Sequence, residues 1–299
     1  MKNLSQSALL LAGCLTMSAA LKAQDTRAVP KSFLQKPEQS ESWNPEVLTV
    51  NPPAFLGAPP GDALVLFNGK NLDNWVSVKD ASPAKWELKD GLLTVVKGAG
   101  NISTKQNFID FQLHLEWRVP VEPETVKGQE KGNSGVFLLG LYEVQILNSF
   151  QNRTYRNGQA GSIYKQSAPL ANVTNRPGGW NSYDIIFTSP RFRFNGSLET
   201  PGYVTVLHNG VAVQNHLALQ GTTEEVGPPK LIAHGPGPIS LQDHGNAVSF
   251  RNIWIRDLYP KPARPAAPRA AVNPSAIPGA DPALLPATKP AQTQPGKRN

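Results

Sequence analysis

The segment Ser240–Phe250, SLQDHGNAVSF, places three hydrogen-bonding side chains between two apolar stretches. Apolar residues alternate on both sides, which predicts a strand, a tight turn and a second strand, a hairpin. Gln242, Asp243 and His244 occupy the predicted turn and are followed by a glycine. Because histidine exchanges protons near neutral pH, His244 is a candidate acid/base, with Gln242 as a candidate ligand-binding group. The alternative is a turn in which His244 only bonds to a neighbour.

The segment YEVQILNS, residues 142–149, carries a second polar pair. Successive side chains of a strand point to opposite faces, so Glu143 and Gln145 share the open face of the predicted sheet. They are either solvated surface or part of a site. A site is favoured by GNSGVF, which puts Asn133 at a glycine-flanked bend, and by GSIYKQSAP, which presents Tyr164 between glycine and proline. We therefore predict two catalytic residues (Glu143 and His244) and four substrate-binding residues (Asn133, Gln145, Tyr164 and Gln242).

A further strand, FQLHLEWRV, buries every second residue from Phe111 and shows Glu116 and Arg118 on its polar face. These two suit either a cross-strand ion pair or contacts with a substrate. Trp180 opens the strand GGWNSYDI and is either core or a stacking platform. The sequence thus adds Glu116, Arg118 and Trp180 to the predicted substrate-binding residues. His208 and His216 flank another turn, and we expect both at the surface.

Several kinds of chemistry lack their sequence signals. The chain has no His-x-His, no His-Glu-x-x-His and no Asp-rich calcium loop, so no metal ligands are predicted. Gly-x-Ser-x-Gly and phosphate-binding glycine loops are absent as well. No cofactor is predicted, and the recruitment of a divalent metal stays open.

The ends of the 299-residue chain differ in composition from its middle. Residues 1–23 resemble a secretory signal peptide; the alternative is a lipoprotein signal acylated at Cys14, and both imply export. Cys14 is the only cysteine, which leaves the mature protein without a disulfide. Residues 24–60 read as an extended lead-in, and 259–299 as a disordered basic tail rich in Pro and Ala.

The tail also accounts for most of the positive charge. Its six basic residues and one acidic residue give +5 of the formal +7. Nucleic-acid binding needs basic residues clustered on a folded face, so we predict no nucleic-acid partner. The only long apolar run lies in the predicted signal peptide and is too short to span a membrane, so no transmembrane span is predicted.

Residues 61–258 show period-two alternation almost throughout. The dipeptides Asp90-Gly91 and Asn209-Gly210 each separate two alternating runs, as in hairpins with type I′ turns. No helical period exceeds two turns. Many half-buried strands without helices predict an all-β fold, an antiparallel two-sheet jelly-roll sandwich.

Seven motifs in register resemble the 3-keto-disaccharide hydrolase domain family: LVLFNGKNLDNW, FQLHLEWRV with GNSGVFL, YEVQILNS, GSIYKQSAP, GGWNSYDI, HNGVAV and GPISLQDHGNAVSFRNIWIRD. The resemblance runs from about Leu64 to Asp257. It implies a concanavalin-like jelly roll that acts on oxidised sugars, beside a separate oxidoreductase that makes the 3-keto group.

That jelly roll is distantly similar to glycoside hydrolase family 16, whose Glu-x-Asp-x-x-Glu here reads Glu143, Gln145 and Asn148. A retaining glycosidase needs two carboxyl groups, and only one remains. A 3-keto sugar offers another route, because the ketone acidifies the C2 proton and allows base-assisted elimination at the glycosidic bond. The sequence thus predicts an exported enzyme that cleaves 3-keto-glycosides or 3-keto-disaccharides.

Two other functions stay open. The same fold could be a non-catalytic carbohydrate-binding module that uses Trp180 and Tyr164 as stacking platforms, or an adaptor domain of an envelope complex. The environment of Glu143 separates catalyst from binding module. A catalyst should place this carboxyl in a cleft near His244 with a shifted pKa.

Overall fold

The structure, a computed structural model, describes residues 40–44 and 46–258. The predicted signal peptide, the first part of the predicted lead-in and the predicted tail lie outside the described residues. Contacts within the chain define one compact unit from Thr49 onward, and the fold below belongs to it.

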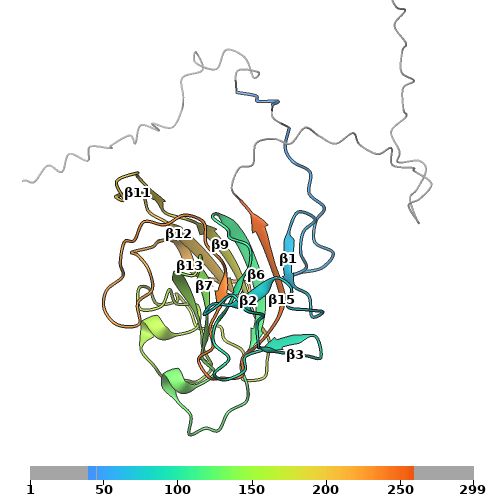
Figure 1. The fold of residues 1–299 in the computed structure, drawn as a ribbon, viewed down its shortest axis with the longest axis vertical. Coiled ribbons are helices and arrows are strands. Elements are labelled where there is room, and N and C mark those ends of the chain that lie inside the picture. Colours follow the sequence, from blue (N-terminus) through green and yellow to red (C-terminus); the bar gives the residue numbers. More distant parts are fainter. Residues whose placement is uncertain (1–39, 45, 259–299) are drawn as a thin grey trace, which may run out of the picture. The chain divides into compact units, whose positions relative to one another are not determined.

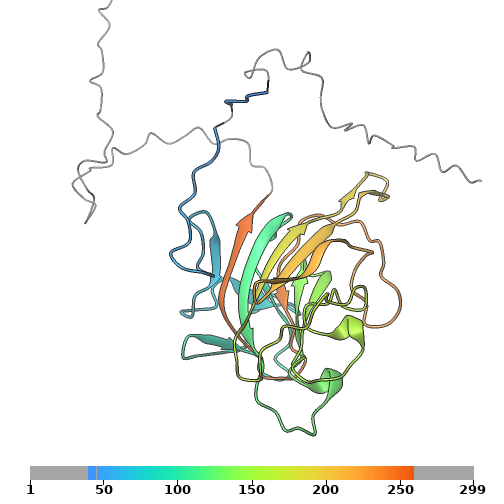
Figure 2. The same cartoon turned by 180° about the vertical axis from the view of Figure 1, so that it is seen from behind.

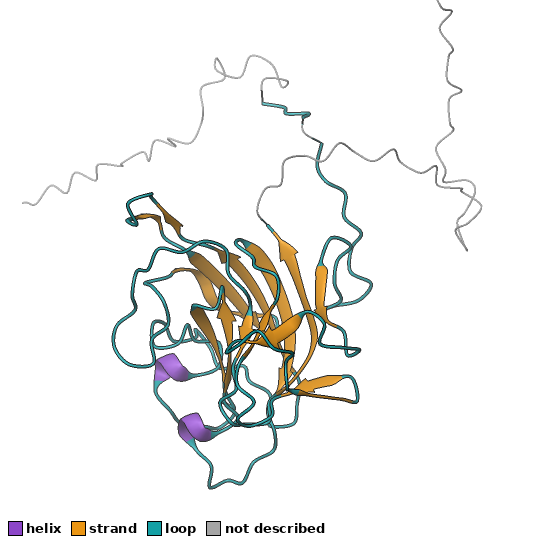
Figure 3. Cartoon of the chain, viewed as in Figure 1, coloured by secondary structure: helices purple, strands orange, loops and turns teal. Residues whose placement is uncertain are grey.

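The described chain consists of antiparallel strands with two single-turn 3-10 segments, η3 (Gly128–Glu130) and η4 (Arg156–Gly158), and no other helix (Figure 3). The strands are β1 (Leu64–Phe67), β2 (Trp75–Ser77), β3 (Glu87–Lys89), β4 (Leu92–Thr94), β5 (Ile102–Thr104), β6 (Phe111–Arg118), β7 (Ser134–Leu138), β8 (Tyr142–Ile146), β9 (Asn181–Thr188), β10 (Arg191–Phe192), β11 (Leu198–Thr200), β12 (Tyr203–His208), β13 (Val211–Ala218), β14 (Ser240–Leu241) and β15 (Ser249–Asp257). No helix among the described residues is long and apolar enough to cross a membrane.

Two large sheets form the sandwich (Figures 1 and 2). The eight-stranded sheet has the order β13-β12-β9-β6-β15-β4-β3, and β1 pairs with the second half of β15. The five-stranded sheet has the order β2-β5-β14-β7-β8, and β10 and β11 form a separate ribbon. All pairings within the sheets are antiparallel, which confirms the jelly-roll sandwich expected from the sequence.

The core lies between the two sheets, because each strand turns alternate residues toward it. From the eight-stranded sheet, β6 contributes Phe111, Leu113, Leu115 and Trp117; from the five-stranded sheet, β8 contributes Tyr142, Val144 and Ile146. Each buried side chain of this size contributes about 1.5–3 kcal/mol to folding. The opposite residues of β6 and β8 face away from the core, and these are the polar ones.

The turn predictions have different outcomes. Asp90, Gly91, Asn209 and Gly210 all have positive φ (53°, 75°, 51° and 78°), as type I′ hairpin turns require, and both hairpins are confirmed. The hairpin predicted for Ser240–Phe250 is wrong. β14 belongs to the five-stranded sheet and β15 to the eight-stranded sheet, so residues 242–248 cross from one sheet to the other.

The expected surface position of His208 is also wrong. Its side chain is fully buried at the end of β12, with ring centroids 5.5 Å from Trp117 and 5.0 Å from Tyr183. Nε2 lies 3.2 Å from Asn181 Oδ1, and burial lowers the pKa of His208 to about 4. His208 is thus a neutral core residue. His216 is exposed, as expected, and stacks on Tyr203.

This difference predicts unequal effects of two histidine substitutions. His208→Ala should lower the free energy of unfolding by about 2–4 kcal/mol, because it opens a cavity between two large aromatic side chains. His216→Ala should change it by about 0.5 kcal/mol or less, as is usual at the surface. Urea denaturation of both variants measures the difference, and equal effects would contradict the burial of His208.

Candidate active site

Glu143 lies on β8 at the edge of the five-stranded sheet, paired with Phe137 of β7. Its side chain points away from the sandwich core, as the alternation predicts, but it is only 4% exposed. Gly135, diagonally opposite on β7, makes this burial possible, because a Cβ at that position would overlap Glu143 Oε1. The glycine, read from the sequence as part of a bend, is therefore a strand residue whose bare Cα makes room for the carboxyl group.

Residues 160–167 cover the free edge of β8. The Gln145 N–H donates to Ser162 O (3.0 Å), the Gly161 N–H to Gln145 O (2.9 Å) and the Tyr164 N–H to Glu143 O (3.0 Å). These bonds fix the backbone of Tyr164 beside Glu143. The Tyr164 hydroxyl in turn lies 2.6 Å from the hydroxyl of Tyr155, a residue with no signal in the sequence.

The crossing segment after β14 supplies Gln242 and His244. The Gln242 N–H donates to Gly135 O (3.0 Å), which ties this segment to the strand that carries the glycine. Asp243 has a structural role, because its carboxylate accepts from the N–H groups of Gly100 and Gly245. His244 is exposed at the rim. The three adjacent polar residues thus divide between the site and the turn that supports it.

These elements enclose a pocket of about 400 Å³. Six of the predicted site residues line it (Asn133, Glu143, Gln145, Tyr164, Gln242 and His244), together with Phe137, Thr223 and Glu225. Phe137 supplies an aromatic wall. Thr223 also accepts the backbone N–H of Glu143 at 2.9 Å.

The pocket changes the chemistry of its one buried carboxyl group. Burial raises the pKa of Glu143 to about 8, opposed by the positive charge of Lys165. The carboxyl group is therefore mostly protonated at neutral pH and can donate a proton. Burial, followed by the hydrogen bond with Tyr164, raises the pKa of Tyr155 above its usual value, so the Tyr155 hydroxyl keeps its proton at neutral pH.

Three amide oxygens complete the polar lining. The Asn133 amide donates to Gln129 O (2.8 Å), and the Gln145 amide donates to Gln129 Oε1 (3.0 Å). The side-chain amide oxygens of Asn133, Gln145 and Gln242 are buried and accept no hydrogen bond from the described protein. Since buried acceptors need donors, the pocket suits a ligand that carries hydroxyl groups. No group of three or more His, Cys, Asp or Glu residues in the described chain could hold a metal ion.

Asn148, the third residue of the strand pattern, does not line the pocket. β8 ends at Ile146, and the Asn148 side chain is fully buried. Only Glu143 and Gln145 of that pattern reach the site.

The other three predicted substrate-binding residues do not line this pocket. Glu116 and Arg118 are on β6 of the opposite sheet, where Glu116 pairs with Arg251 across the strands (2.6 Å). Trp180 stacks against the guanidinium groups of Arg118 (4.8 Å) and Arg251 (4.0 Å). The alternation of polar and apolar residues along one strand predicts which side chains share a face. It does not predict which of the two sheets the strand joins.

The pocket thus lies on the outer face of one sheet of an all-β jelly-roll sandwich, and its acceptor oxygens suit a ligand with hydroxyl groups. A family model described as the 3-keto-alpha-glucoside-1,2-lyase-like domain matches residues 62–256. The match covers most of the chain, and the protein belongs to this family.

Two relatives agree with this assignment. The chain is 51% identical to a candidate glycosyl hydrolase of Parabacteroides distasonis with a crystal structure at 2.13 Å resolution, over 75% of this chain and 97% of that one, with a TM-score of 0.71. It is 23% identical over 249 residues to the 3-keto-disaccharide hydrolase of Bacteroides thetaiotaomicron, covering 65% of this chain and 78% of that protein. The protein is thus glycosidase-like.

The raised pKa of Glu143 predicts a pH-dependent stability. The folded protein keeps this proton up to about pH 8, whereas the unfolded chain releases it near the ordinary glutamate pKa of 4.5. The free energy of unfolding therefore falls as pH rises between these values, by up to about 4–5 kcal/mol. Because glutamine does not ionise, the stability of Glu143→Gln relative to the wild type should increase over this range.

Denaturant melts at pH 4.5, 6 and 8 measure this trend. Glu225→Gln is the matched control, because it removes an exposed carboxyl group from the same pocket. Its free energy of unfolding relative to the wild type should change less with pH than that of Glu143→Gln. A Glu143→Gln difference that does not change with pH would show that the carboxyl group is not desolvated.

Proposed function

We propose that the pocket around Glu143 cleaves 3-keto-glycosides or 3-keto-disaccharides by elimination across C1 and C2, with addition of water giving the hydrolysed sugar. The observation that carries this proposal is the combination of one protonated buried carboxyl group with three unpartnered amide oxygens in a single pocket. The lyase-like description of the family and the hydrolase name of the Bacteroides relative support the two stages.

A base must first remove the proton on C2, which the neighbouring ketone makes acidic. His244 lines the pocket from its exposed rim and is assigned this role. The electron pair from the C–H bond passes to the ketone oxygen and forms an enediolate. The Tyr164 hydroxyl, held by Tyr155, is placed to donate a hydrogen bond to that oxygen.

The C1–oxygen bond then breaks as the ketone re-forms. The departing oxygen takes the proton of Glu143 and leaves as an alcohol, while the sugar keeps a C1–C2 double bond. The proton on His244 returns to Glu143 through water, which restores both groups. Addition of water, with hydroxyl at C1 and hydrogen at C2, gives the free 3-keto sugar.

The amide oxygens of Asn133, Gln145 and Gln242 accept hydrogen bonds from the sugar hydroxyls and so orient the ring. An ordinary retaining mechanism is disfavoured, because the strand pattern supplies one carboxyl group where two are needed. A pure binding module is disfavoured by Glu143, since ligand binding alone does not need a desolvated carboxyl group whose pKa is raised to about 8.

The cellular setting belongs to the same proposal. The signal-peptide pattern of residues 1–23 supports export to the periplasm or cell envelope, with acylation at Cys14 as the alternative. The substrate would come from a separate sugar 3-oxidoreductase, the partner that the resemblance to the 3-keto-disaccharide hydrolase family implies.

The ketone should be essential to turnover. A 3-keto-glucoside has an acidic C2 proton, whereas its unoxidised parent has none, so the parent should be inert. Release of the aglycone from both compounds, followed in parallel, measures this requirement. Comparable rates on the two compounds would contradict elimination.

Loss of either proton-transfer group should slow the reaction. Glu143→Gln and His244→Ala should each lower kcat on the 3-keto substrate by about 10²–10⁴-fold, the usual effect of removing a positioned acid or base. The surface variant His216→Ala is the control and should keep wild-type activity. Near wild-type rates for both Glu143→Gln and His244→Ala would place the catalytic site elsewhere.

A further inference from the structure

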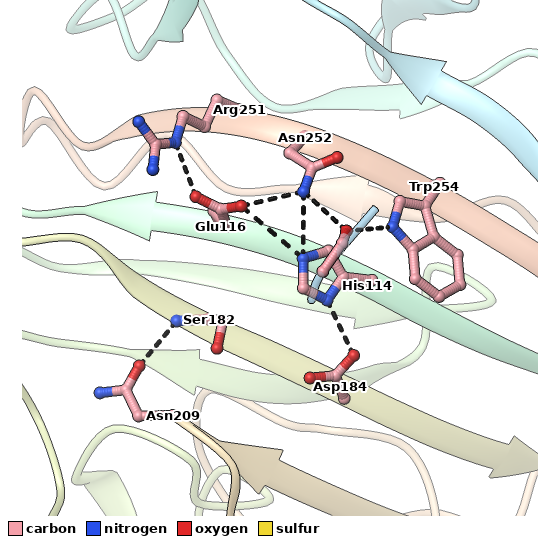
Figure 4. Close-up of polar contacts among 9 residues, drawn as sticks. His114, Glu116, Ser182, Asp184, Asn209, Arg251, Asn252 and Trp254 are labelled. Atoms are coloured by element: carbon pink, nitrogen blue, oxygen red, sulfur yellow. Dashed lines mark hydrogen bonds and ion pairs between the residues drawn. The ribbon is translucent and has the colours of Figure 1, made fainter. Parts of the chain in front are cut away.

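A larger cavity, of about 650 Å³, lies on the outer face of the eight-stranded sheet. Its floor comes from β6 (Gln112 and His114), β9 (Ser182 and Asp184) and β15 (Trp254), as Figure 4 shows for the last four residues. It shares no residue with the pocket around Glu143, which opens on the five-stranded sheet. The two cavities are therefore separate sites.

Residues 50–60 form an apolar wall of this cavity, to which Pro52, Pro53 and Leu56 contribute. Gly57 anchors the wall, because its carbonyl oxygen accepts from Trp254 Nε1 (2.9 Å) and Asn252 Nδ2 (2.8 Å). Its φ of 86° is in the left-handed region that favours glycine.

His114 and Asp184 face each other across β6 and β9, with His114 Nδ1 2.8 Å from Asp184 Oδ1. The His114 ring is buried and stacks on Trp254 at 5.2 Å with 14° between the planes. Its Nε2 lies 3.3 Å from Asn252 Nδ2. Held by Asp184 on one side and Trp254 on the other, His114 is a positioning residue that fixes the Asp184 carboxylate.

The sheet carries backbone strain beside this pair. Asn252 has a φ of 47° at a bulge of β15, where the register with β6 shifts between Arg251 and Trp254. Its side chain donates to Glu116 Oε1 (2.9 Å) as well as to Gly57. Bulges and left-handed non-glycine residues cluster next to binding sites, where they direct side chains.

The lining also holds polar groups without protein partners. Among the described residues, none donates to or accepts from the Ser182 hydroxyl or the Gln112 side-chain amide, and only one Asp184 oxygen is bonded. A hydroxyl, an amide and a carboxylate oxygen beside Trp254 in the floor, opposite a wall of proline and leucine, suit a neutral ring with hydroxyl groups at its edge and C–H groups on its faces.

We propose that this cavity is a second, non-catalytic binding site for a neutral pyranose, separate from the proposed reaction site and indifferent to the 3-keto group. Asp184, Ser182 and Gln112 bind the sugar hydroxyls, and the wall of residues 50–60 covers the ring. The site would hold an unoxidised glycan unit on one sheet while the pocket of the other sheet remains free.

Titration with methyl α-D-glucopyranoside tests the proposal by NMR. The indole N–H of Trp254, identified among the six tryptophans by Trp254→Phe, should shift and saturate at millimolar sugar. Ser182→Ala and Gln112→Ala each remove a hydrogen-bonding group without touching His114, and each should weaken this binding by about tenfold. Gln145→Ala, in the other pocket, should leave the Trp254 titration unchanged.

Turnover separates this proposal from the proposed function. Ser182→Ala and Gln112→Ala should keep kcat/KM on the 3-keto substrate within about twofold of the wild type. A Trp254 signal that does not move with sugar, or that moves equally in the wild type and both outer-face variants, would overturn the second site whatever the activity. A tenfold or larger loss of turnover in those variants would overturn its separation from catalysis.

Discussion

The burial of the Glu143 carboxyl group is the constraint on which the reaction pocket depends. A carboxylate removed from water loses hydration energy, and the group responds by holding its proton, with a pKa near 8. Among the residues that the structure describes, no cationic side chain bonds directly to it, and Lys165 only opposes the shift. The sandwich core supplies the stability that tolerates this unfavourable burial. The result is a proton donor at neutral pH on a rigid strand.

The neighbouring backbone provides the space for that burial. Gly135 lets the carboxyl group lie over β7, residues 160–167 cover the edge of β8, and the segment after β14 covers the remaining side. In this pocket Gln145 stands where the family 16 pattern has a carboxylate, which removes like-charge repulsion and leaves an acceptor oxygen for a hydroxyl group. A site with one acid and several amides suits a substrate whose ketone already lowers the barrier to removing a proton.

The sequence predicts the strand pattern and both I′ hairpins, and it singles out six residues that line one pocket, because alternation and turn chemistry are local. It fails where the outcome depends on which sheet a strand joins. Ser240–Phe250 looks like a hairpin but spans two sheets, Glu116 lies on the opposite sheet from Glu143, and Trp180 packs against Arg118 and Arg251 of that sheet. His208 looks like a surface residue because its neighbours form a turn, yet it faces inward. Thr223, Phe137 and Gln129 contribute through long-range contacts that no local pattern signals.

The most direct test of this account is the titration of Glu143 itself, followed by the ¹³C shift of its side-chain carboxyl group and assigned with Glu143→Gln. The account predicts a single transition with a pKa of about 8, well above the ordinary glutamate pKa of 4.5. A transition near 4.5 would show a solvated carboxylate and would contradict the assignment of Glu143 as the proton donor.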